Sequence, residues 1–238
     1  AALRLVGVDH LVGHLFSVFL KRPNDTPPPP NFPFVGLLVS GGHTELVLVK
    51  DFGSYELLGS TRDDAAGEAY DKVAKILGLG YPGGPVIDKL ALQGDPASYQ
   101  LPTPLSGTDE IEFSFSGLKT AAVTIVRKAE EAGQQLDLEN FCASFQRAVV
   151  SSLTNKIALA VKKTGVRRLT LSGGVAANSG LRAALTEMSD KRGWELFLPP
   201  KAICTDNAVM VAAAGYSNFM RGITSDMTLS PSPSWEIW

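Results

Sequence analysis

An α/β fold is predicted by three features of this 238-residue sequence. In its second half, short apolar β-rich runs alternate with longer amphipathic stretches, as where RRLTLSGG precedes VAANSGLRAALTEMSDKRG. In its first half, the runs FVGLLVS and TELVLVK flank a Gly-Gly turn, which is typical of a β-hairpin. A hydrophobic fraction of 45% is enough for a substantial core. Strands that alternate with helices are characteristic of the α/β class.

The individual elements follow from periodicity and turn signals. Apolar β-rich runs predict strands at residues 3–8, 34–40, 44–50, 55–60, 167–172 and 194–199. Amphipathic spacing predicts helices at residues 9–20, 63–78, 81–94, 116–133, 138–165, 175–193 and 205–222. Asp9 is the expected N-cap of the first helix; Asp63 or Asp64 is that of the second, which Gly78 or Gly80 should end.

Residues 22–33, RPNDTPPPPNFP, contain four consecutive prolines, which fit neither helix nor sheet. We expect an exposed polyproline-type spacer there rather than a ligand for an SH3-like partner. No apolar run is long enough to span a membrane, and the N-terminal residues lack the features of a signal peptide. Because the sequence opens directly on a strand-like segment, we expect it to be part of a longer fold.

The net charge of −2 gives the whole chain no field that would gather nucleic acid. The charge is uneven, however, because residues 114–168 hold nine Lys or Arg against four Asp or Glu. That region is either a phosphate-facing surface or a solvated helix face. Cys142 and Cys204 are far apart and lie in apolar surroundings, so we expect two buried thiols in a reducing compartment.

Two of the three histidines stand four residues apart in DHLVGHLFS, residues 9–17. On a helix, this spacing places His10 and His14 on one face, where both could bind one metal ion. The zinc-protease motif H-E-x-x-H requires a Glu after the first His, and Leu11 stands there instead. The residues alone leave two alternatives: a metal-binding pair, or one capping and one packed histidine.

Three Gly-Gly turns stand at the end of an apolar strand or the start of a helix, at residues 40–44, 82–85 and 172–174. Without Cβ atoms, such turns let backbone N–H groups approach an anion closely. A strand–Gly-Gly–strand hairpin beside a strand–Gly-Gly–helix turn is how the actin, hexokinase and Hsp70 class holds a nucleotide. Each turn alone is weak support, because most Gly-Gly pairs are plain turns.

Four polar residues near these turns have both functional and ordinary interpretations. Asp71 and Asp88 are candidates for a ribose hydroxyl, but Asp71 could form an exposed pair with Lys75 and Asp88 could favour a helix dipole. Asn178 lies in the first turn of its helix, where a capping role is the alternative. Asp206 stands at the start of the last helix, where an N-cap is ordinary.

Together the motifs closely resemble the TsaD family, the tRNA threonylcarbamoyladenosine transferases once called O-sialoglycoprotein endopeptidases. The resemblance covers roughly residues 9–215 and rests on HLVGH, LLVSGGHTEL, DDAAGEAYDKVAKILGLGYPGGP, FSFSGLKTA, LSGGVAANSGLR and CTDNAVMVA. It implies the α/β, actin-like ATPase fold (ASKHA, ribonuclease H-like) with two lobes. It also implies transfer of threonylcarbamoyl from threonylcarbamoyl-AMP to the exocyclic amine of the adenosine just 3′ of the anticodon in tRNA.

The resemblance also implies a division of the chain and a set of site residues. Residues 1–35 would be a remnant of the N-terminal lobe, residues 36–205 the C-terminal lobe, and residues 206–238 a return toward the first lobe. One divalent metal ion, iron or zinc, would be bound by His10, His14 and Asp206. The implied contacts to threonylcarbamoyl-AMP or another adenine nucleotide are Leu38, Val39, Ser40, Gly41, Gly42, Asp71, Gly84, Asp88 and Asn178. His43 is either a further contact or structural, and no catalytic residue is assigned.

The sequence departs from the family at two points. Val12 stands where relatives usually carry Glu, which would alter the surroundings of the metal ligands rather than the ligands themselves. Relatives also have roughly a hundred further residues before this point, so the N-terminal lobe would be incomplete and catalysis by this chain alone is doubtful. The alternative function is a non-catalytic scaffold paralogue of the same fold, or a nucleotide-binding fragment.

The resemblance implies tRNA as a partner, with residues 119–168 as candidate backbone contacts. The motifs look closer to the bacterial and organellar branch. The expected protein partners are therefore a dimerising paralogue and a small ATPase, or a second copy of the chain in an organellar homodimer. We expect a cytoplasmic location, or an organellar one in a eukaryote, and no membrane contact.

Overall fold

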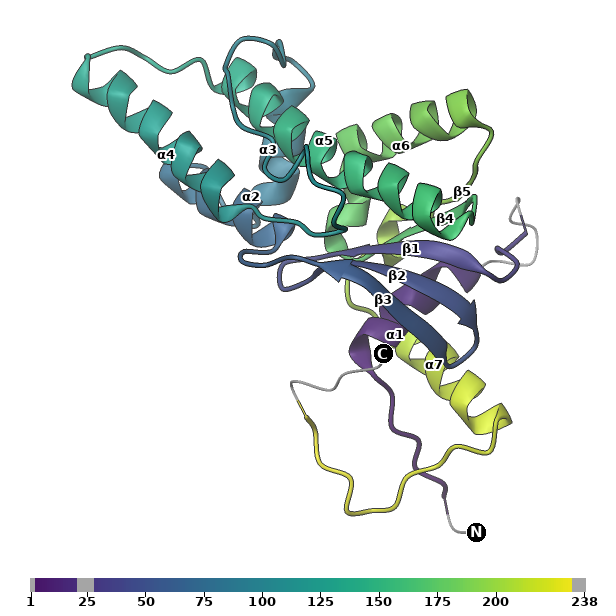
Figure 1. Ribbon diagram of the computed structural model, residues 1–238. Helices are drawn as coiled ribbons and strands as arrows, with labels where there is room; N and C mark the ends of the chain where they lie inside the picture. Colours follow the sequence, from purple (N-terminus) through teal and green to yellow (C-terminus); the bar gives the residue numbers. More distant parts are fainter. Residues whose placement is uncertain (1–2, 21–27, 233–238) are drawn as a thin grey trace.

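A five-stranded mixed sheet forms the centre of the computed structural model, which describes residues 3–20 and 28–232 (Figure 1). Its strand order is β3-β2-β1-β4-β5. The strands are β1 (Phe34–Val39), β2 (Thr44–Asp51), β3 (Ser54–Ser60), β4 (Arg168–Ser172) and β5 (Glu195–Phe197). β1, β2 and β3 pair antiparallel, whereas β4 is parallel to β1 and β5 is parallel to β4. The predicted hairpin and the α/β class are confirmed.

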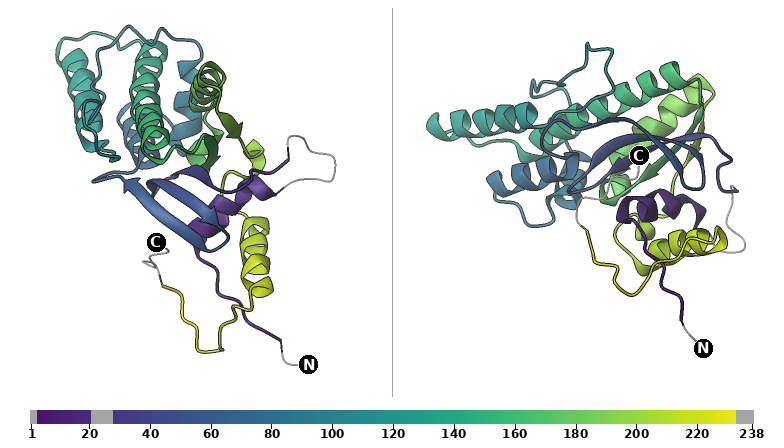
Figure 2. Two further views of the ribbon diagram at one scale, coloured as in Figure 1. Left: turned by 45° about the vertical axis from the view of Figure 1, so that its right-hand side comes forward. Right: turned by 60° about the horizontal axis from the view of Figure 1, so that its bottom comes forward.

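Helices cover both faces of the sheet. They are α1 (His10–Phe16), α2 (Ala66–Ile76), α3 (Gly83–Ala91), α4 (Ser116–Glu131), α5 (Leu138–Thr164), α6 (Ser179–Arg192) and α7 (Ala208–Met220). Short 3₁₀ turns occupy Ser17–Phe19, Gly174–Ala177 and Lys201–Ile203. α1 and α7 lie side by side on one face, and α2 to α6 lie on the other (Figures 1 and 2). The first and last helices of the chain are therefore neighbours.

The alternation of side chains along β1 explains why both faces are covered. Val35, Leu37 and Val39 face the large core beneath α2 to α6, and Phe34 and Leu38 face a smaller core beneath α1. All five are at most 1% exposed. Successive side chains of a strand point to opposite faces, so a strand that is apolar at every position needs cover on both. Burial of each such side chain contributes about 1.5–3 kcal/mol.

Local signals place the ends of α5, the longest helix. Asp137 is its N-cap and accepts a hydrogen bond from the backbone N–H of Asn140. Gly165 ends it at φ 71°, in the left-handed region that favours glycine. Between these ends α5 buries Phe141 and Phe145 in the large core. The predicted bounds of this helix are confirmed to within a residue.

Both cysteines are free and buried, as predicted. Cys142 lies in α5 and Cys204 follows the last 3₁₀ turn, and each belongs to the large core. Burial raises the pKa of the Cys142 thiol to about 12. The Cys142 thiol therefore acts as a small apolar side chain.

The strand predicted at residues 3–8 is wrong. Leu5 forms only an isolated bridge to Ser225, and Leu3 is 93% exposed. A strand needs a continuous partner for its backbone groups, and the segment opposite Leu5 is irregular. Two other contacts tie this segment to the C-terminal part of the chain: Gly7 N–H donates to Ser225 Oγ, and Asn218 Nδ2 donates to the carbonyl of Gly7.

The predicted N-cap of the second helix is also wrong. Ala65 is the N-cap of α2, and Thr44 Oγ1 accepts the hydrogen bond of Ala66 N–H at 2.9 Å. Asp63 instead accepts from the N–H group of Phe115 at the start of α4. The helix end was predicted correctly, because Gly78 follows the last turn at φ 68°.

The polyproline segment lies partly outside the described residues, and its described part, residues 28–33, is irregular. The division of the chain at residues 35 and 205 stays a prediction. Among the described residues, no helix combines the length and the apolar character that crossing a membrane requires.

Candidate metal centre and glycine turns

α1 presents its two histidines on one face. Asp9 caps the helix, and its Oδ1 accepts hydrogen bonds from Leu11 N–H at 2.8 Å and Val12 N–H at 3.1 Å. The four-residue spacing then brings the rings of His10 and His14 to 4.7 Å between centroids, in an edge-to-face arrangement. Since Asp9 is the cap, neither histidine is needed to begin the helix.

Asp206 lies just before α7 but does not cap it. The cap is Asn207, whose Oδ1 accepts a hydrogen bond from Met210 N–H at 2.9 Å. The ordinary interpretation of Asp206 as a helix cap is therefore wrong. Its carboxylate is 76% exposed and is directed at α1, where Oδ1 lies 3.4 Å from His10 Nε2 and 3.1 Å from His14 Nε2.

These three side chains form one cluster of donors. A ligand atom from each of His10, His14 and Asp206 lies within 4.8 Å of the other two. The side chain of His10 is 54% exposed, whereas that of His14 is only 2% exposed. The cluster is thus anchored in the protein on one side and open on the other.

The environment of His14 favours the neutral imidazole. Burial lowers its pKa below the ordinary value of 6.5, and the neighbouring His10 lowers it further. Asp206 acts in the opposite direction but does not reverse the shift. A metal ligand must be unprotonated at the coordinating nitrogen, so this environment suits coordination.

The donor set fits a transition metal. Two imidazole nitrogens and one carboxylate oxygen are typical ligands of zinc and of non-haem iron, which leave further positions open. Nδ1 of His14 is buried and has no hydrogen-bond partner among the described residues. Nε2, the nitrogen that faces Asp206, is therefore the one available for a metal.

Val12 occupies an apolar contact between α1 and α7. It is 7% exposed and clusters with Phe16 and Ala214. The departure from the expected Glu therefore replaces a charged side chain by one that packs α1 against α7.

The turn between β1 and β2 is held in a defined shape by its own serine. Ser40 Oγ accepts hydrogen bonds from Gly42 N–H at 3.3 Å and His43 N–H at 3.1 Å. The carbonyl of Ser40 accepts from Gly67 N–H at 3.1 Å, which ties the turn to α2. Positions for a Cβ atom on Gly41 and Gly42 meet nothing within 4 Å. The tip of the turn is thus open to a ligand.

Leu38 and Val39 cannot offer their side chains to a ligand from β1. Both side chains are fully buried, one in each core. Any contact from these two positions would have to come from the backbone at the end of the strand.

The third glycine turn connects the sheet to the metal centre. Gly173 has φ 87°, and a Cβ atom there would lie 2.4 Å from the carbonyl oxygen of Val39. This position therefore requires glycine on both conformational and steric grounds. A Cβ atom on Gly174 would lie 3.9 Å from Cγ2 of Thr205, the neighbour of Asp206. The ends of β4 and β1 consequently lie close to the segment that carries Asp206.

Asp71 secures the second glycine turn. Its Oδ1 accepts a hydrogen bond from Gly83 N–H at 2.7 Å, which links α2 to the first residue of α3. No ion pair between Asp71 and Lys75 is formed, so the exposed-pair interpretation is wrong. A Cβ atom on Gly84 would meet nothing within 4 Å.

Asp88 and Asn178 meet at the start of α6. Asp88 accepts hydrogen bonds from the backbone N–H of Ser179, at 2.9 Å and 3.1 Å to its two oxygens, and from Ser179 Oγ at 2.8 Å. Asn178 is the N-cap of α6 and also donates to Gln146 Oε1 at 2.7 Å. The structure therefore gives both residues a structural partner at the same helix end.

His43 stands beside the hairpin turn, and its side chain pairs with that of Glu45, two residues further along in β2. Its Nδ1 lies 3.2 Å from Glu45 Oε1. The hydrogen bond to Glu45 raises the pKa of His43, and burial opposes this only in part. The charge of His43 is also among the causes that lower the pKa of His14. A charge at the hairpin turn therefore acts on His14 of the candidate metal centre.

Sequence reasoning did not identify several residues that shape these turns. Thr44 of β2 accepts a hydrogen bond from the first N–H of α2, Gly67 donates to the carbonyl of Ser40, and Ser179 donates to Asp88. Gln146 reaches Asn178 from α5. Each of these contacts joins residues distant in sequence, so no local sequence motif predicts it.

A family model described as tRNA N6-adenosine threonylcarbamoyltransferase, TsaD, matches residues 1–213. The chain belongs to the TsaD family. Among curated relatives of that name, the protein of Clostridioides difficile (strain 630) is 47% identical over 98% of this chain and 68% of its own length. That of Dictyoglomus turgidum is 48% identical over 96% of this chain and 66% of its own length. The chain thus spans about two thirds of the length of its TsaD relatives.

Two solved structures have the same fold at low sequence identity. Full-length HypF, in a phosphate- and nucleotide-bound form, superposes with a TM-score of 0.64 at 16% identity and covers 89% of this chain and 35% of its own. HypF of T. kodakarensis gives 0.65 at 15% identity, covering 93% of this chain and 38% of its own. With the TsaD match, they identify the actin-like ATPase type of α/β fold.

Proposed function

We propose that this chain transfers a threonylcarbamoyl group from threonylcarbamoyl-AMP to the exocyclic amine of an adenosine in tRNA, the one just 3′ of the anticodon. The observation that carries the proposal is the convergence of His10, His14 and Asp206 beside the glycine turns, in a member of the TsaD family.

The metal ligands would be His10 Nε2, His14 Nε2 and a carboxylate oxygen of Asp206, and the ion would be iron or zinc. When bound, it would act as a Lewis acid that stabilises negative charge on the departing phosphate. Asp206 also balances the charge of the ion. His14 is held rigidly by burial, so it fixes where the ligand set stands.

The glycine turns would bind and orient the nucleotide. The Gly41 N–H group suits a phosphate oxygen because no side chain blocks its approach, and the Gly42 N–H group would join it on release from Ser40 Oγ. Asp71, Gly84, Asp88 and Asn178 would surround the nucleoside, with the carboxylates able to accept hydrogen bonds from ribose hydroxyls. Holding both substrates in a reactive geometry is a large part of the acceleration that such a site can supply.

The reaction exchanges one bond to the carbamoyl carbon for another. The adenosine amine forms a bond to this carbon and loses a proton, and the bond from the carbon to the phosphate oxygen breaks. AMP departs with the bonding electron pair. Because charge develops on the phosphate as the bond breaks, the Gly41–Gly42 turn would accelerate the reaction most if its N–H groups bound that charge.

The test combines metal analysis with a transfer assay on the same preparations. The chain is incubated with threonylcarbamoyl-AMP and unmodified tRNA, and the nucleosides of the digested tRNA are quantified by mass spectrometry. We expect about one metal ion per chain, and the appearance of threonylcarbamoyladenosine when the chain is extended at its N-terminus to the length of its TsaD relatives. His10→Ala should lose both. Normal metal content and transfer in this variant would refute the proposed site.

A non-catalytic scaffold of the same fold is the second candidate. A scaffold would need neither metal nor nucleotide. Two observations argue against it: three possible metal ligands are clustered, and the lowered pKa of His14 favours the neutral imidazole. Metal-free protein that still binds its partners, with no transfer under any condition, would favour the scaffold. The protein partners that we propose are a dimerising paralogue and a small ATPase, or a second copy of the chain, in a cytoplasmic or organellar setting.

A further inference from the structure

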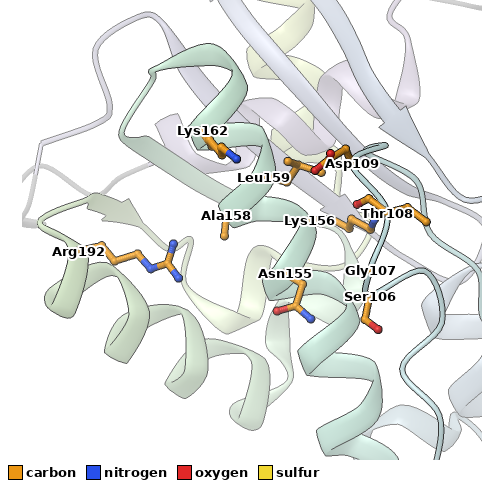
Figure 3. A pocket seen from close by; sticks show the side chains of 10 residues that line it. All are labelled: Ser106, Gly107, Thr108, Asp109, Asn155, Lys156, Ala158, Leu159, Lys162 and Arg192. Carbon is orange, nitrogen blue, oxygen red and sulfur yellow. Dashed lines mark hydrogen bonds between the residues drawn. The ribbon is translucent and has the colours of Figure 1, made fainter.

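A cavity of about 510 Å³ lies away from the metal centre, between α5, the end of α6 and the loop at residues 106–109 (Figure 3). The helices that line it belong to the layer opposite α1 and α7 (Figure 1). The metal cluster and this cavity are therefore on different sides of the sheet. No role in the proposed reaction accounts for it.

Lys156 fixes the wall of the cavity. This residue of α5 is 2% exposed, and its Nζ donates hydrogen bonds to Thr108 Oγ1 at 2.8 Å and to the carbonyls of Thr108 at 3.2 Å and Glu110 at 2.7 Å. Burial lowers the pKa of Lys156, and the nearby carboxylates of Glu112, Glu110 and Asp109 act in the opposite direction. The loop is thus held against α5 by the three hydrogen bonds of Lys156.

Two further cations line the same space. Lys162 comes from α5 and Arg192 from the last turn of α6, and the guanidinium of Arg192 is directed toward α5 (Figure 3). Neither forms an ion pair among the described residues. Asp109 is the one carboxylate among the lining residues, against the two exposed cations Lys162 and Arg192. The balance of charge therefore favours an anion.

The remaining lining groups suit a phosphate rather than a base. Ser106 and Asn155 supply a hydroxyl and an amide, both on exposed residues, and Gly107 leaves its backbone accessible. No aromatic side chain lines the cavity, so it offers no surface on which a base could stack. A flexible polymer backbone could enter, because the lining residues of the loop are exposed.

We propose that this cavity binds a phosphodiester of the RNA backbone, remote from the reacting adenosine. This inference rests on the proposed function, because it takes tRNA as the substrate. Within the basic stretch of residues 119–168 it selects Lys162 as a phosphate contact, and it adds Arg192 from α6. The chemistry that it recognises, a phosphate ester, is shared with free mononucleotides, so the experiment must separate the two sources.

The experiment measures the affinity of the chain for unmodified tRNA by fluorescence anisotropy at several salt concentrations. Lys162→Ala and Arg192→Ala remove exposed cations that line the cavity. Their matched controls are Lys163→Ala and Lys191→Ala, which remove the same charge one residue away and outside the lining. A parallel titration with AMP tests the mononucleotide source.

We expect each lining variant to weaken tRNA binding about three-fold to thirty-fold and to reduce the salt slope by about 0.7–0.9. The controls should change neither quantity as much, and AMP affinity should be unchanged. Equal effects in lining and control variants would overturn the proposal, as would absent tRNA binding. Lining variants that weaken AMP binding but leave tRNA binding unchanged would assign the cavity to mononucleotides instead.

The two proposals fail separately. If tRNA binding depends on the cavity but no transfer occurs with metal-loaded protein, only the proposed function is refuted. If His10→Ala abolishes metal binding and transfer while the lining variants bind tRNA like the unaltered chain, only the cavity proposal is refuted.

Discussion

His14 Nε2 lies 3.1 Å from Oδ1 of Asp206, although the two residues stand near opposite ends of the chain. Contact between α1 and α7 creates this relationship, and an apolar cluster around Val12 and Ala214 maintains it. The cluster of His10, His14 and Asp206 is thus a consequence of packing between α1 and α7. Changes at the ligands and changes at the helix ends should therefore have separable effects.

Asp206→Ala and Asn207→Ala form a matched pair that tests this separation. Asp206→Ala should remove the bound metal but leave the stability of the metal-free protein nearly unchanged, because Asn207 caps α7. Asn207→Ala should keep the metal and lower the free energy of unfolding by about 1 kcal/mol through loss of the cap. Metal analysis and thermal unfolding of chelator-treated protein measure the two effects. If Asp206→Ala kept the metal and lowered stability while Asn207→Ala lost the metal, Asp206 would be the residue that stabilises the start of α7.

The contributions of His14 and His43 to stability should depend on pH with opposite signs. The pKa of His14 is lowered, mainly by burial, so between its folded-state pKa and 6.5 the unfolded state binds more protons. Its contribution to stability is present above pH 6.5 and is lost as the pH falls through the lowered pKa. The pKa of His43 is raised by Glu45, so its contribution is full below pH 6.5 and is lost as the pH rises through the raised pKa.

Denaturant unfolding of metal-free protein at a series of pH values checks these signs. His14→Gln should lessen the loss of stability on acidification, and His43→Gln should increase it. Chelation is necessary because bound metal would add its own proton linkage. Two variants with the same pH dependence would contradict the environments assigned to the two rings.

Local signals in the sequence were sufficient for much of the fold. The hairpin around Gly41 and Gly42 and the long helix ended by Gly165 each depend on residues close together in the chain. By contrast, the segment around Leu5 has the composition of a strand but no continuous partner. Pairing is decided by tertiary structure, so composition alone could not exclude that strand.

The candidate site shows more clearly that local sequence signals are not sufficient. Capping rules allow either Asp206 or Asn207 to begin α7, and only the position of α1 distinguishes them. The spacing of His10 and His14 predicted a shared helix face but left metal binding as one of two alternatives. Resemblance to the TsaD family supplied the third ligand. The hydrogen bond from the first N–H of α2 to Thr44 Oγ1 had no local signal, because the two residues are distant in sequence.

Gly84→Ala should separate ligand binding from helix stability. Gly84 is the second residue of α3 and Gly117 the second of α4, and a Cβ atom at either position meets nothing within 4 Å. Both substitutions to Ala should therefore raise stability, by up to about 1 kcal/mol. Only Gly84→Ala should weaken binding of threonylcarbamoyl-AMP, because its methyl group would occupy the proposed nucleotide site. Calorimetric titration and thermal unfolding measure both quantities, and equal binding by the two variants would exclude close contact at Gly84.

A double-mutant cycle between Asp88 and Ser179 should reveal a strong coupling at the start of α6. Asp88 accepts hydrogen bonds from both the N–H and the hydroxyl of Ser179, so Asp88→Ala should cost about 1–3 kcal/mol of unfolding free energy. With Ser179→Ala as the second substitution, the coupling should reach at least about 0.5 kcal/mol. Glu187 and Lys191, an exposed i,i+4 pair on the same helix, provide the control, with an expected coupling of about 0.2–0.5 kcal/mol. If urea unfolding gave no coupling between Asp88 and Ser179, the Asp88 carboxylate would not stabilise the start of α6. It would then be free to bind a ribose hydroxyl without first giving up these hydrogen bonds.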